Sequence, residues 1–196
     1  MSGNKLKLLL WGLVSVNVVA LLWVGVIAPR FEARAAADIG RGDYALQITD
    51  GGTFTQASLE TGPSVVFFGF THCPEVCPTT LGDILTWQEE LGAGEDAFNI
   101  YFVTVDSERD TAEILGDYVG WVPGVVGVTG AQEDVDKALS AFKIYAEKVA
   151  LDDGDYTMDH SASVLLFDEA GRYSDRIAYQ EDPAVALDKL RVLLSS

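Results

Sequence analysis

The chain has 196 residues, with 13 Lys and Arg against 30 Asp and Glu, which gives a formal net charge of −17. Two Cys and two His are too few for a disulfide-dense scaffold, and the His spacing excludes a two-His metalloprotease helix. Strong acidity also argues against a nucleic-acid partner, because binding phosphate requires clustered Lys and Arg. At 48% hydrophobic content, the chain can bury the core of one domain and still carry an appendage.

The first feature along the chain is an uncharged run of 21 residues at 8–28. At about 1.5 Å per residue, a helix of this length spans roughly 31 Å, the thickness of a bilayer's hydrocarbon core. A cleaved secretory signal has a shorter apolar region, although the alanine-rich residues 33–37 offer a small-residue cleavage site. Trp11 and Trp23 lie near the two ends, as interfacial anchors do. We therefore expect residues 1–30 to form an uncleaved, single-pass membrane anchor.

The charge is divided unevenly between this segment and the rest. Residues 1–34 sum to +3 and the remaining 162 residues to −20. Lys5, Lys7 and the amino terminus precede the apolar run and Arg30 and Arg34 follow it, so a small excess of positive charge favours a cytoplasmic N-terminus by the positive-inside rule. Anionic lipids of the inner leaflet would repel the acidic part. We expect a linker at 31–42, where apolar periodicity is lacking, and an extracytoplasmic domain at 43–196, facing the bacterial periplasm or an equivalent compartment.

The domain begins with a predicted β-hairpin at 44–55, centred on an Asp-Gly-Gly turn. Val65–Phe70 (VVFFGF) is a continuous apolar run of strand length, typical of a strand covered on both faces. A helix is predicted to follow at Pro78–Leu91, with Pro78 at its first position and with Gly92 and Gly94 closing it.

Strands and helices then alternate to the end of the chain. Further strands are predicted at Asn99–Val105, Val125–Val128, Val164–Phe167 and Arg172–Tyr179, and further helices at Thr111–Tyr118, Gln132–Phe142 and Asp182–Leu194. This order, with an antiparallel hairpin near the end, predicts an α/β domain whose mixed sheet is flanked by helices.

Both cysteines, Cys73 and Cys77, lie between the first buried strand and its helix. The carboxyl end of a strand beside a helix N-terminus is where α/β proteins place ligand sites, and the helix dipole there stabilises a thiolate. Sulfurs at this spacing can converge on one ion, or form a disulfide where the backbone allows it. The pair therefore indicates a soft-metal site or a thiol-disulfide exchange site, with a structural disulfide as the plain alternative.

His160, in a polar stretch predicted to be irregular, is the best candidate for a third metal ligand. Neighbouring central strands would bring it beside Cys73, and a Cys/Cys/His set suits copper in either oxidation state. Asp106 or Asp159 could orient the imidazole or lie close to the metal. We expect His72 to point away from the pocket, toward the surface.

A charged segment, residues 106–110, follows the strand at Asn99–Val105. Asp106, Arg109 and Asp110 could act near the metal, and they fit equally well a helix cap with a surface ion pair. The spacing leaves both interpretations open.

Three segments resemble the Sco/SenC family. They are FFGFTHCPEVCPTTL at Phe67–Leu81, VTVDSERDT at Val103–Thr111 and DGDYTMDHSASVLLFDEAGR at Asp153–Arg172. The resemblance covers about 43–195, with an apolar segment in the family's anchor position. It implies a thioredoxin-like fold with copper ligands at Cys73, Cys77 and His160. Ser107 replaces the proline that the family usually has after the Asp, a difference that touches no ligand.

The same resemblance implies a function. Members of the family are membrane-anchored copper proteins that assist assembly of cytochrome c oxidase. It implies a metallochaperone, not an enzyme, which receives copper from a donor chaperone, holds it as Cu(I) or Cu(II), and passes it to the binuclear copper site of oxidase subunit II.

Three alternatives remain. The protein could be a thiol-disulfide reductase in which Cys73 and Cys77 cycle to reduce the cysteines of subunit II, or a sensor of copper or redox state. A peroxidase fits less well, because Thr71 is two residues before Cys73 and the peroxiredoxin pattern requires three.

Overall fold

The computed structural model describes residues 3–92, 97–152 and 154–195. The chain divides into two compact units, Met1–Asp38 and Ile39–Ser196. Every strand that the structure describes lies in the second unit, and the first unit is helical from Gly3 to Ala37.

The first unit contains α1 (Gly3–Leu22), a π-helical segment (Trp23–Ile27) and α2 (Ala28–Ala37). Within it, Leu10–Ile27 is long and apolar enough to cross a membrane. By length and composition alone, such a segment fits a membrane anchor and also a secretory signal near an N-terminus.

Helical backbone continues to Ala37, beyond the point at which the sequence predicts a linker to begin. Residues 33–37 read ARAAA, and alanine has the highest helix propensity of all residues. Local propensity therefore forms a helix here although the segment has no apolar periodicity.

The second unit is built on a seven-stranded sheet with the order β2-β1-β5-β4-β3-β8-β9. Its strands are β1 (Leu46–Ile48), β2 (Thr53–Phe54), β3 (Ser64–Gly69), β4 (Asn99–Thr104), β5 (Val125–Thr129), β8 (Val164–Phe167) and β9 (Tyr173–Ile177). The interior strand β3 has parallel β4 on one side and antiparallel β8 on the other. The sheet is mixed, and the structure confirms the predicted fold class.

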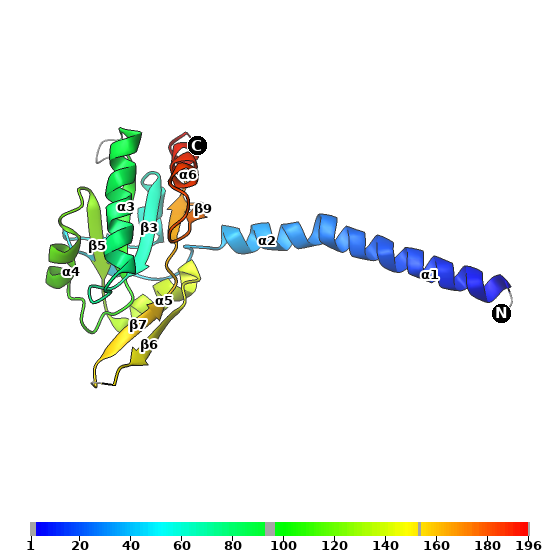
Figure 1. Cartoon of the computed structure of the whole chain (residues 1–196), viewed down its shortest axis with the longest axis horizontal. Coiled ribbons are helices and arrows are strands. Elements are labelled where there is room, and N and C mark those ends of the chain that lie inside the picture. The colour runs from blue at the N-terminus through cyan, green and yellow to red at the C-terminus, as the bar shows by residue number, and fades with distance from the viewer. Residues whose placement is uncertain (1–2, 93–96, 153, 196) are drawn as a thin grey trace. The chain divides into compact units, whose positions relative to one another are not determined.

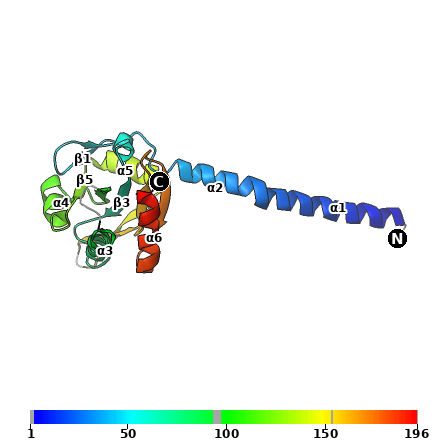
Figure 2. The ribbon, with the colours of Figure 1, turned by 90° about the horizontal axis from the view of Figure 1, so that it is seen from above.

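Helices cover both faces of this sheet (Figures 1 and 2). They are α3 (Val76–Leu91), α4 (Ala112–Val119), α5 (Gln132–Phe142) and α6 (Pro183–Leu194), with a 3₁₀ turn at Gln56–Glu60. Figure 2 shows α3 and α6 on one side of the strands and α5 on the other. Phe68 of β3 accordingly packs on Phe142 of α5, with ring centroids 5.1 Å apart. The neighbouring Phe67 faces the opposite side and packs on Phe102 of β4, because successive side chains of a strand alternate.

The predicted helices are confirmed, with small shifts at their ends. The helix at Gln132–Phe142 has the predicted limits, whereas α3 begins at Val76, two residues before Pro78. Proline fits there because the N–H groups of a first helical turn have no partner within the helix. Gly92, with a φ of 58°, provides the left-handed residue that ends α3. Gly94 lies outside the described residues.

A second sheet contains only β6 (Ala146–Ala150) and β7 (Tyr156–His160), which pair antiparallel. The sequence predicts an irregular stretch up to His160, and this prediction is wrong. Nearly all of β6 is exposed and β7 is only partly buried, so neither strand carries a buried face of alternating apolar residues. Gly154, with a φ of 90°, lies in the connection between them.

Candidate metal centre

The two cysteines lie where β3 leads into α3. Cys73 is in the connecting loop and Cys77 is in the first turn of the helix. Both are free thiols, with exposed fractions of 9% and 0%. The backbone N–H of Cys77 donates to Sγ of Cys73 over 3.3 Å. The first turn of α3 therefore directs a helix N–H at a sulfur, an arrangement that stabilises a thiolate.

His160 reaches the cysteines from the end of β7. A few residues later the chain enters β8, where Val164 lies opposite Phe67 of β3, so the start of β8 meets the end of the strand that leads to the cysteines. Nε2 of His160 is 3.8 Å from Sγ of Cys77. The candidate donor atoms of His160, Cys73 and Cys77 all lie within 4.8 Å of one another. The fold thus brings together the three residues that the sequence singles out.

The imidazole of His160 is oriented by a backbone carbonyl. Its Nδ1 lies 2.9 Å from the carbonyl oxygen of Ser161. Because a carbonyl can only accept, Nδ1 carries the proton and Nε2 presents its lone pair on the side of Cys77. The ring also meets Phe70 at right angles, with centroids 5.7 Å apart.

Neither Asp106 nor Asp159 holds the imidazole, so that expectation is corrected. Asp159 is exposed, because consecutive residues of β7 face opposite sides of the strand. Asp106 pairs with Arg109, and since its side chain is only 1% exposed, this is not a surface ion pair. The helix-cap interpretation is wrong as well: the side chain of Thr111 accepts from the N–H of Ile114 and caps α4.

The hydrogen bond between the two thiols separates their pKa values. Donation from Cys77 lowers the pKa of Cys73, although partial burial acts in the opposite direction. The same bond raises the pKa of Cys77, and burial adds to this effect. Of the two thiols, Cys73 is therefore the one that more readily becomes a thiolate, and Cys77 keeps its proton more strongly.

Gly69, the last residue of β3, makes room for the site. A Cβ atom at this position would lie 2.8 Å from Sγ of Cys77 and 2.7 Å from the ring of Phe102. Reasoning from the sequence missed this residue. The available signal was a glycine inside an otherwise apolar strand, which marks a close approach between neighbours.

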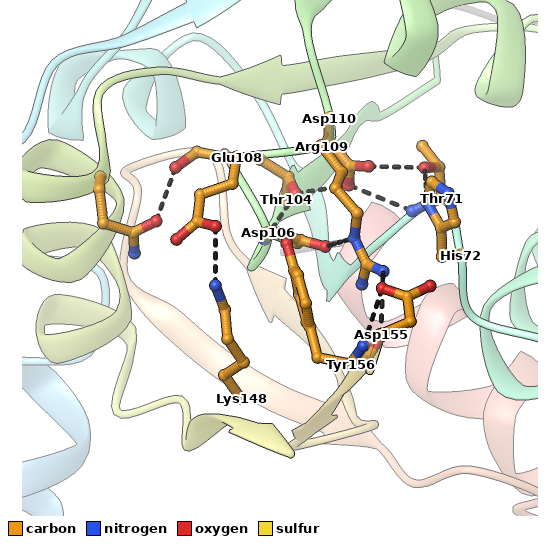
Figure 3. Close-up of polar contacts among 12 residues, drawn as sticks. Thr71, His72, Thr104, Asp106, Glu108, Arg109, Asp110, Lys148, Asp155 and Tyr156 are labelled. Atoms are coloured by element: carbon orange, nitrogen blue, oxygen red, sulfur yellow. Dashed lines mark hydrogen bonds and ion pairs between the residues drawn. The ribbon is translucent and has the colours of Figure 1, made fainter. Parts of the chain in front are cut away.

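Asp110 ties the cysteine loop to the turn that follows β4 (Figure 3). Its buried carboxylate accepts from the hydroxyl of Thr71 at 2.6 Å and from the backbone N–H of Thr71 at 3.1 Å. The hydroxyl of Thr104 donates to it as well, at 2.6 Å. His72 is exposed, as the sequence predicts, and its Nδ1 lies 3.1 Å from the Thr71 hydroxyl.

The donor set fits copper by its chemistry. Soft thiolates select Cu(I), and an imidazole nitrogen also suits Cu(II). A thiol with a lowered pKa, next to a second thiol, is equally what disulfide exchange requires. Two chemistries therefore fit these residues.

A mixed sheet with a Cys-x-x-x-Cys pair at a strand-helix junction, and a His beside it, defines a thioredoxin-like domain with a candidate metal centre. The chain belongs to the SCO1/SenC family, whose model matches residues 32–195.

Individual relatives are similar over most of the chain. Protein SCO2 of Saccharomyces cerevisiae mitochondria is 32% identical over 171 residues, which cover 82% of this chain and 56% of the yeast protein. The SCO2-like protein of Rickettsia felis is 31% identical over 76% of this chain and 75% of its own length.

Solved structures confirm the thioredoxin-like Sco fold. Bradyrhizobium japonicum ScoI with copper bound has a TM-score of 0.71 and 36% identity, covering 79% of this chain and 99% of that one. Yeast Sco1 with copper bound has a TM-score of 0.72 and 27% identity, covering 81% of this chain and 90% of that one.

Proposed function

We propose that the protein binds copper through Cys73, Cys77 and His160. The observation that carries this proposal is the convergence of three donor atoms within 4.8 Å from two segments far apart in sequence. Two similar domains, from Bradyrhizobium japonicum and yeast, have been solved with copper bound. Two sulfurs and one imidazole nitrogen form a donor set typical of copper.

Copper is the cargo in this proposal. The protein is a metallochaperone that assists maturation of the binuclear copper site of cytochrome c oxidase subunit II, and membership of the SCO1/SenC family supports this role. His160 is partly exposed, so an incoming ligand can replace it without unfolding the domain. A copper donor chaperone loads the site, and subunit II takes the ion by ligand exchange.

The proposed function includes a membrane location. Residues 1–30 form a single-pass anchor, 31–42 a linker and 43–196 the extracytoplasmic copper-binding domain. The apolar helical stretch Leu10–Ile27 supports the anchor, and the charge difference between the two parts of the chain supports the orientation.

A second candidate, thiol-disulfide reduction, is favoured by the lowered pKa of Cys73. The Cys73 thiolate attacks a disulfide of subunit II and releases one client thiolate. Cys77 passes its proton to the released client thiolate, and its own thiolate then attacks the mixed disulfide, which releases the second client thiolate and leaves a Cys73–Cys77 disulfide. Two electrons pass to the client, and an external thiol reductant restores the pair. A copper or redox sensor would use the same residues without delivering copper.

Replacing His160 tests the copper proposal and separates it from the reductase. We expect His160→Ala, in the full chain in detergent micelles, to weaken copper binding by more than about 100-fold, because losing even a partner of a ligand costs roughly 10- to 100-fold. The thiolate-to-Cu(II) charge-transfer absorption should disappear. Copper stoichiometry, this spectrum and the rate of disulfide reduction are measured on the same sample.

His72→Ala is the matched control, since it removes an exposed imidazole one residue from Cys73 and should leave copper binding unchanged. An unchanged stoichiometry and spectrum in His160→Ala would overturn the three-ligand proposal. Lost copper binding with retained reduction would show that the two activities are separable, and complementation of oxidase assembly would then identify the one the cell needs.

A further inference from the structure

His160 ends a hairpin that lies outside the main sheet. Among the strands that the structure describes, β6 and β7 pair with each other and with no strand of the larger sheet. A two-stranded hairpin is only marginally stable by itself, and most of β6 is exposed. The position of His160 relative to the cysteines therefore depends on side-chain contacts between the hairpin and the domain.

The main contacts converge on Tyr156, the first residue of β7 (Figure 3). Its hydroxyl donates to the carboxylate of Asp106 at 2.8 Å, and its carbonyl oxygen accepts from Nη1 of Arg109 at 3.0 Å. The guanidinium carbon of Arg109 lies 3.7 Å from the centroid of the Tyr156 ring. Arg109 also pairs with Asp106 through Nε, so the three side chains form one closed cluster. We call Asp106, Arg109 and Tyr156 the hairpin clamp.

The hairpin clamp contains a buried carboxylate, and the need to satisfy this charge fixes its geometry. Asp106 is 2% exposed, and a buried carboxylate is tolerated only where charged and hydrogen-bonding partners surround it. Burial, followed by the hydrogen bond to Asp106, raises the pKa of Tyr156 to about 12, so its hydroxyl stays a donor at physiological pH. Removing Arg109 or Tyr156 takes a partner away from the buried Asp106 carboxylate, which is energetically costly. The native contacts among these three residues are therefore strongly favoured over alternative arrangements.

The same short turn also holds the cysteine loop. The backbone N–H groups of Arg109 and Asp110 both donate to the carbonyl of Asp106, at 3.2 and 3.0 Å, which closes the turn. The Asp110 carboxylate accepts two hydrogen bonds from Thr71 and so holds the cysteine loop. Residues 106–110 thus contact both segments that carry candidate ligands, one through Asp110 and the other through the clamp.

Phe70 forms a second link between the clamp and the site. The Arg109 guanidinium lies 6.0 Å from the centroid of the Phe70 ring, and Phe70 meets the imidazole of His160 edge-on at 5.7 Å. A shift of Arg109 would therefore displace His160 in two ways: through Tyr156 at the start of β7, and through the Phe70 ring that packs on the imidazole.

We propose that Asp106, Arg109 and Tyr156 are positioning residues that set where His160 lies relative to the cysteine pair and thereby set the copper affinity of the site. This inference rests on the proposed copper-binding function. It assigns these residues no contact with the ion, and their effect is exerted through His160.

Tyr156→Phe is the most selective test, because it removes one hydroxyl and keeps the aromatic ring. In the full chain in detergent, we expect copper affinity to fall about 10-fold, at the lower end of the effects of residues that orient a ligand. The thiolate-to-Cu(II) absorption should shift, because the imidazole no longer sits at the same place. In the copper-free protein, the ring-proton NMR signals of His160 should shift or broaden, a readout that does not depend on copper.

Glu108→Gln provides the matched control. Glu108 belongs to the same turn and contacts the same hairpin through Lys148 at 2.7 Å, but this ion pair is exposed. Its loss should change copper affinity less than 2-fold, an estimate that follows from the small contribution of exposed ion pairs. Arg109→Lys is a second test variant: a lysine keeps the charge but lacks the planar fork that contacts Asp106 and the Tyr156 carbonyl together.

A double-mutant cycle separates positioning from general destabilisation. If the clamp acts through His160, then Tyr156→Phe should weaken copper binding in the wild-type background and add nothing in the His160→Ala background. Two outcomes would overturn the positioning proposal: an equal loss of copper affinity in both backgrounds, or equal copper affinity in Tyr156→Phe and Glu108→Gln. Neither outcome would contradict the proposal that the protein binds copper. Absence of copper binding in the wild-type chain would instead overturn the proposed function.

Discussion

Sγ of Cys77 has three close neighbours that together define its chemistry. Its thiol donates to Cys73, and Nε2 of His160 lies 3.8 Å away. On the side of the sheet, Gly69 leaves the space that the sulfur occupies. The position of the Cys77 sulfur therefore depends on position 69 having no side chain.

Gly69→Ala should therefore disturb the site directly. An added Cβ would lie 2.8 Å from Sγ of Cys77 and 2.7 Å from the ring of Phe102, so one of them must move. We expect a loss of about 1–3 kcal/mol in the free energy of unfolding, typical of an overpacked core, together with weaker copper binding. Urea unfolding and copper titration measure the two effects.

Gly82→Ala is the control for this substitution. Gly82 lies in α3, where an added Cβ meets nothing within 4 Å. Replacing a helical glycine with alanine should stabilise the protein by about 0.5–1 kcal/mol and leave copper binding unchanged. Equal behaviour of the two variants would show that the space at Gly69 is not required.

At the scale of elements, the β8–β9 hairpin borders the site because β8 pairs with β3. The turn between these strands is organised by Asp168. Its carboxylate accepts from the N–H groups of Ala170 and Arg172, at 2.9 and 3.0 Å, and pairs with the Arg172 guanidinium at 2.8 Å. Desolvation raises the pKa of Asp168, but the bonds to Arg172 and Ala170 lower it more, so the net shift is downward.

Asp168→Asn should make the protein less stable in a pH-dependent way. A carboxyl whose pKa is lowered by folding stabilises the native state above its unfolded pKa, near 3.8, and this contribution is lost as the pH falls through the lower folded value. We expect the wild type to exceed the variant by about 1 kcal/mol at pH 7, since bonds to a charged acceptor are the stronger ones. The difference should shrink below pH 3.8. Urea unfolding across this range measures it.

Asp188→Asn is the control, because Asp188 pairs with Arg191 on α6 and its side chain is 75% exposed. Its effect should stay below about 0.5 kcal/mol at every pH. A pH-independent difference for Asp168→Asn would contradict the assignment of the effect to the Asp168 charge.

At the scale of the whole molecule, an apolar helical unit and an acidic α/β domain share one chain. Two polar side chains interrupt the apolar stretch, and each donates a hydrogen bond to its own helix: Ser15 to the carbonyl of Trp11 and Asn17 to that of Leu13, each at 2.9 Å. Hydrogen bonds within the helix lower the cost of placing such polar groups in lipid.

Membrane fractionation tests the anchor. The full chain should remain in the membrane after alkaline carbonate extraction, its intact mass should include residues 1–34, and protease added to spheroplasts should digest the domain. Val18→Asp should reduce insertion, because an acidic residue at mid-span costs about 2.5–3.5 kcal/mol, whereas Val18→Leu should not. A mature mass that lacks the first 34 residues would identify a cleaved signal instead.

The sequence by itself determined the elements whose formation depends on local patterns. The buried runs that became β3 and β4, the amphipathic helix at Gln132–Phe142 and the caps at Asp182 and Gly92 were all predictable, because periodicity and end chemistry act over a few residues. The cysteine pair was predictable as a site because its position follows directly from the strand before it and the helix after it.

Only the tertiary structure decided how the second half of the site is held. The hairpin that carries His160 shows no local pattern of apolar residues from which it could be predicted. Its position depends on Tyr156, which contacts residues 106 and 109, about fifty positions earlier in the chain. Likewise, the need for glycine at position 69 exists only once Cys77 packs against β3. Such contacts join residues that are distant in sequence and close in space, and their geometry is therefore set by the packing of the complete domain.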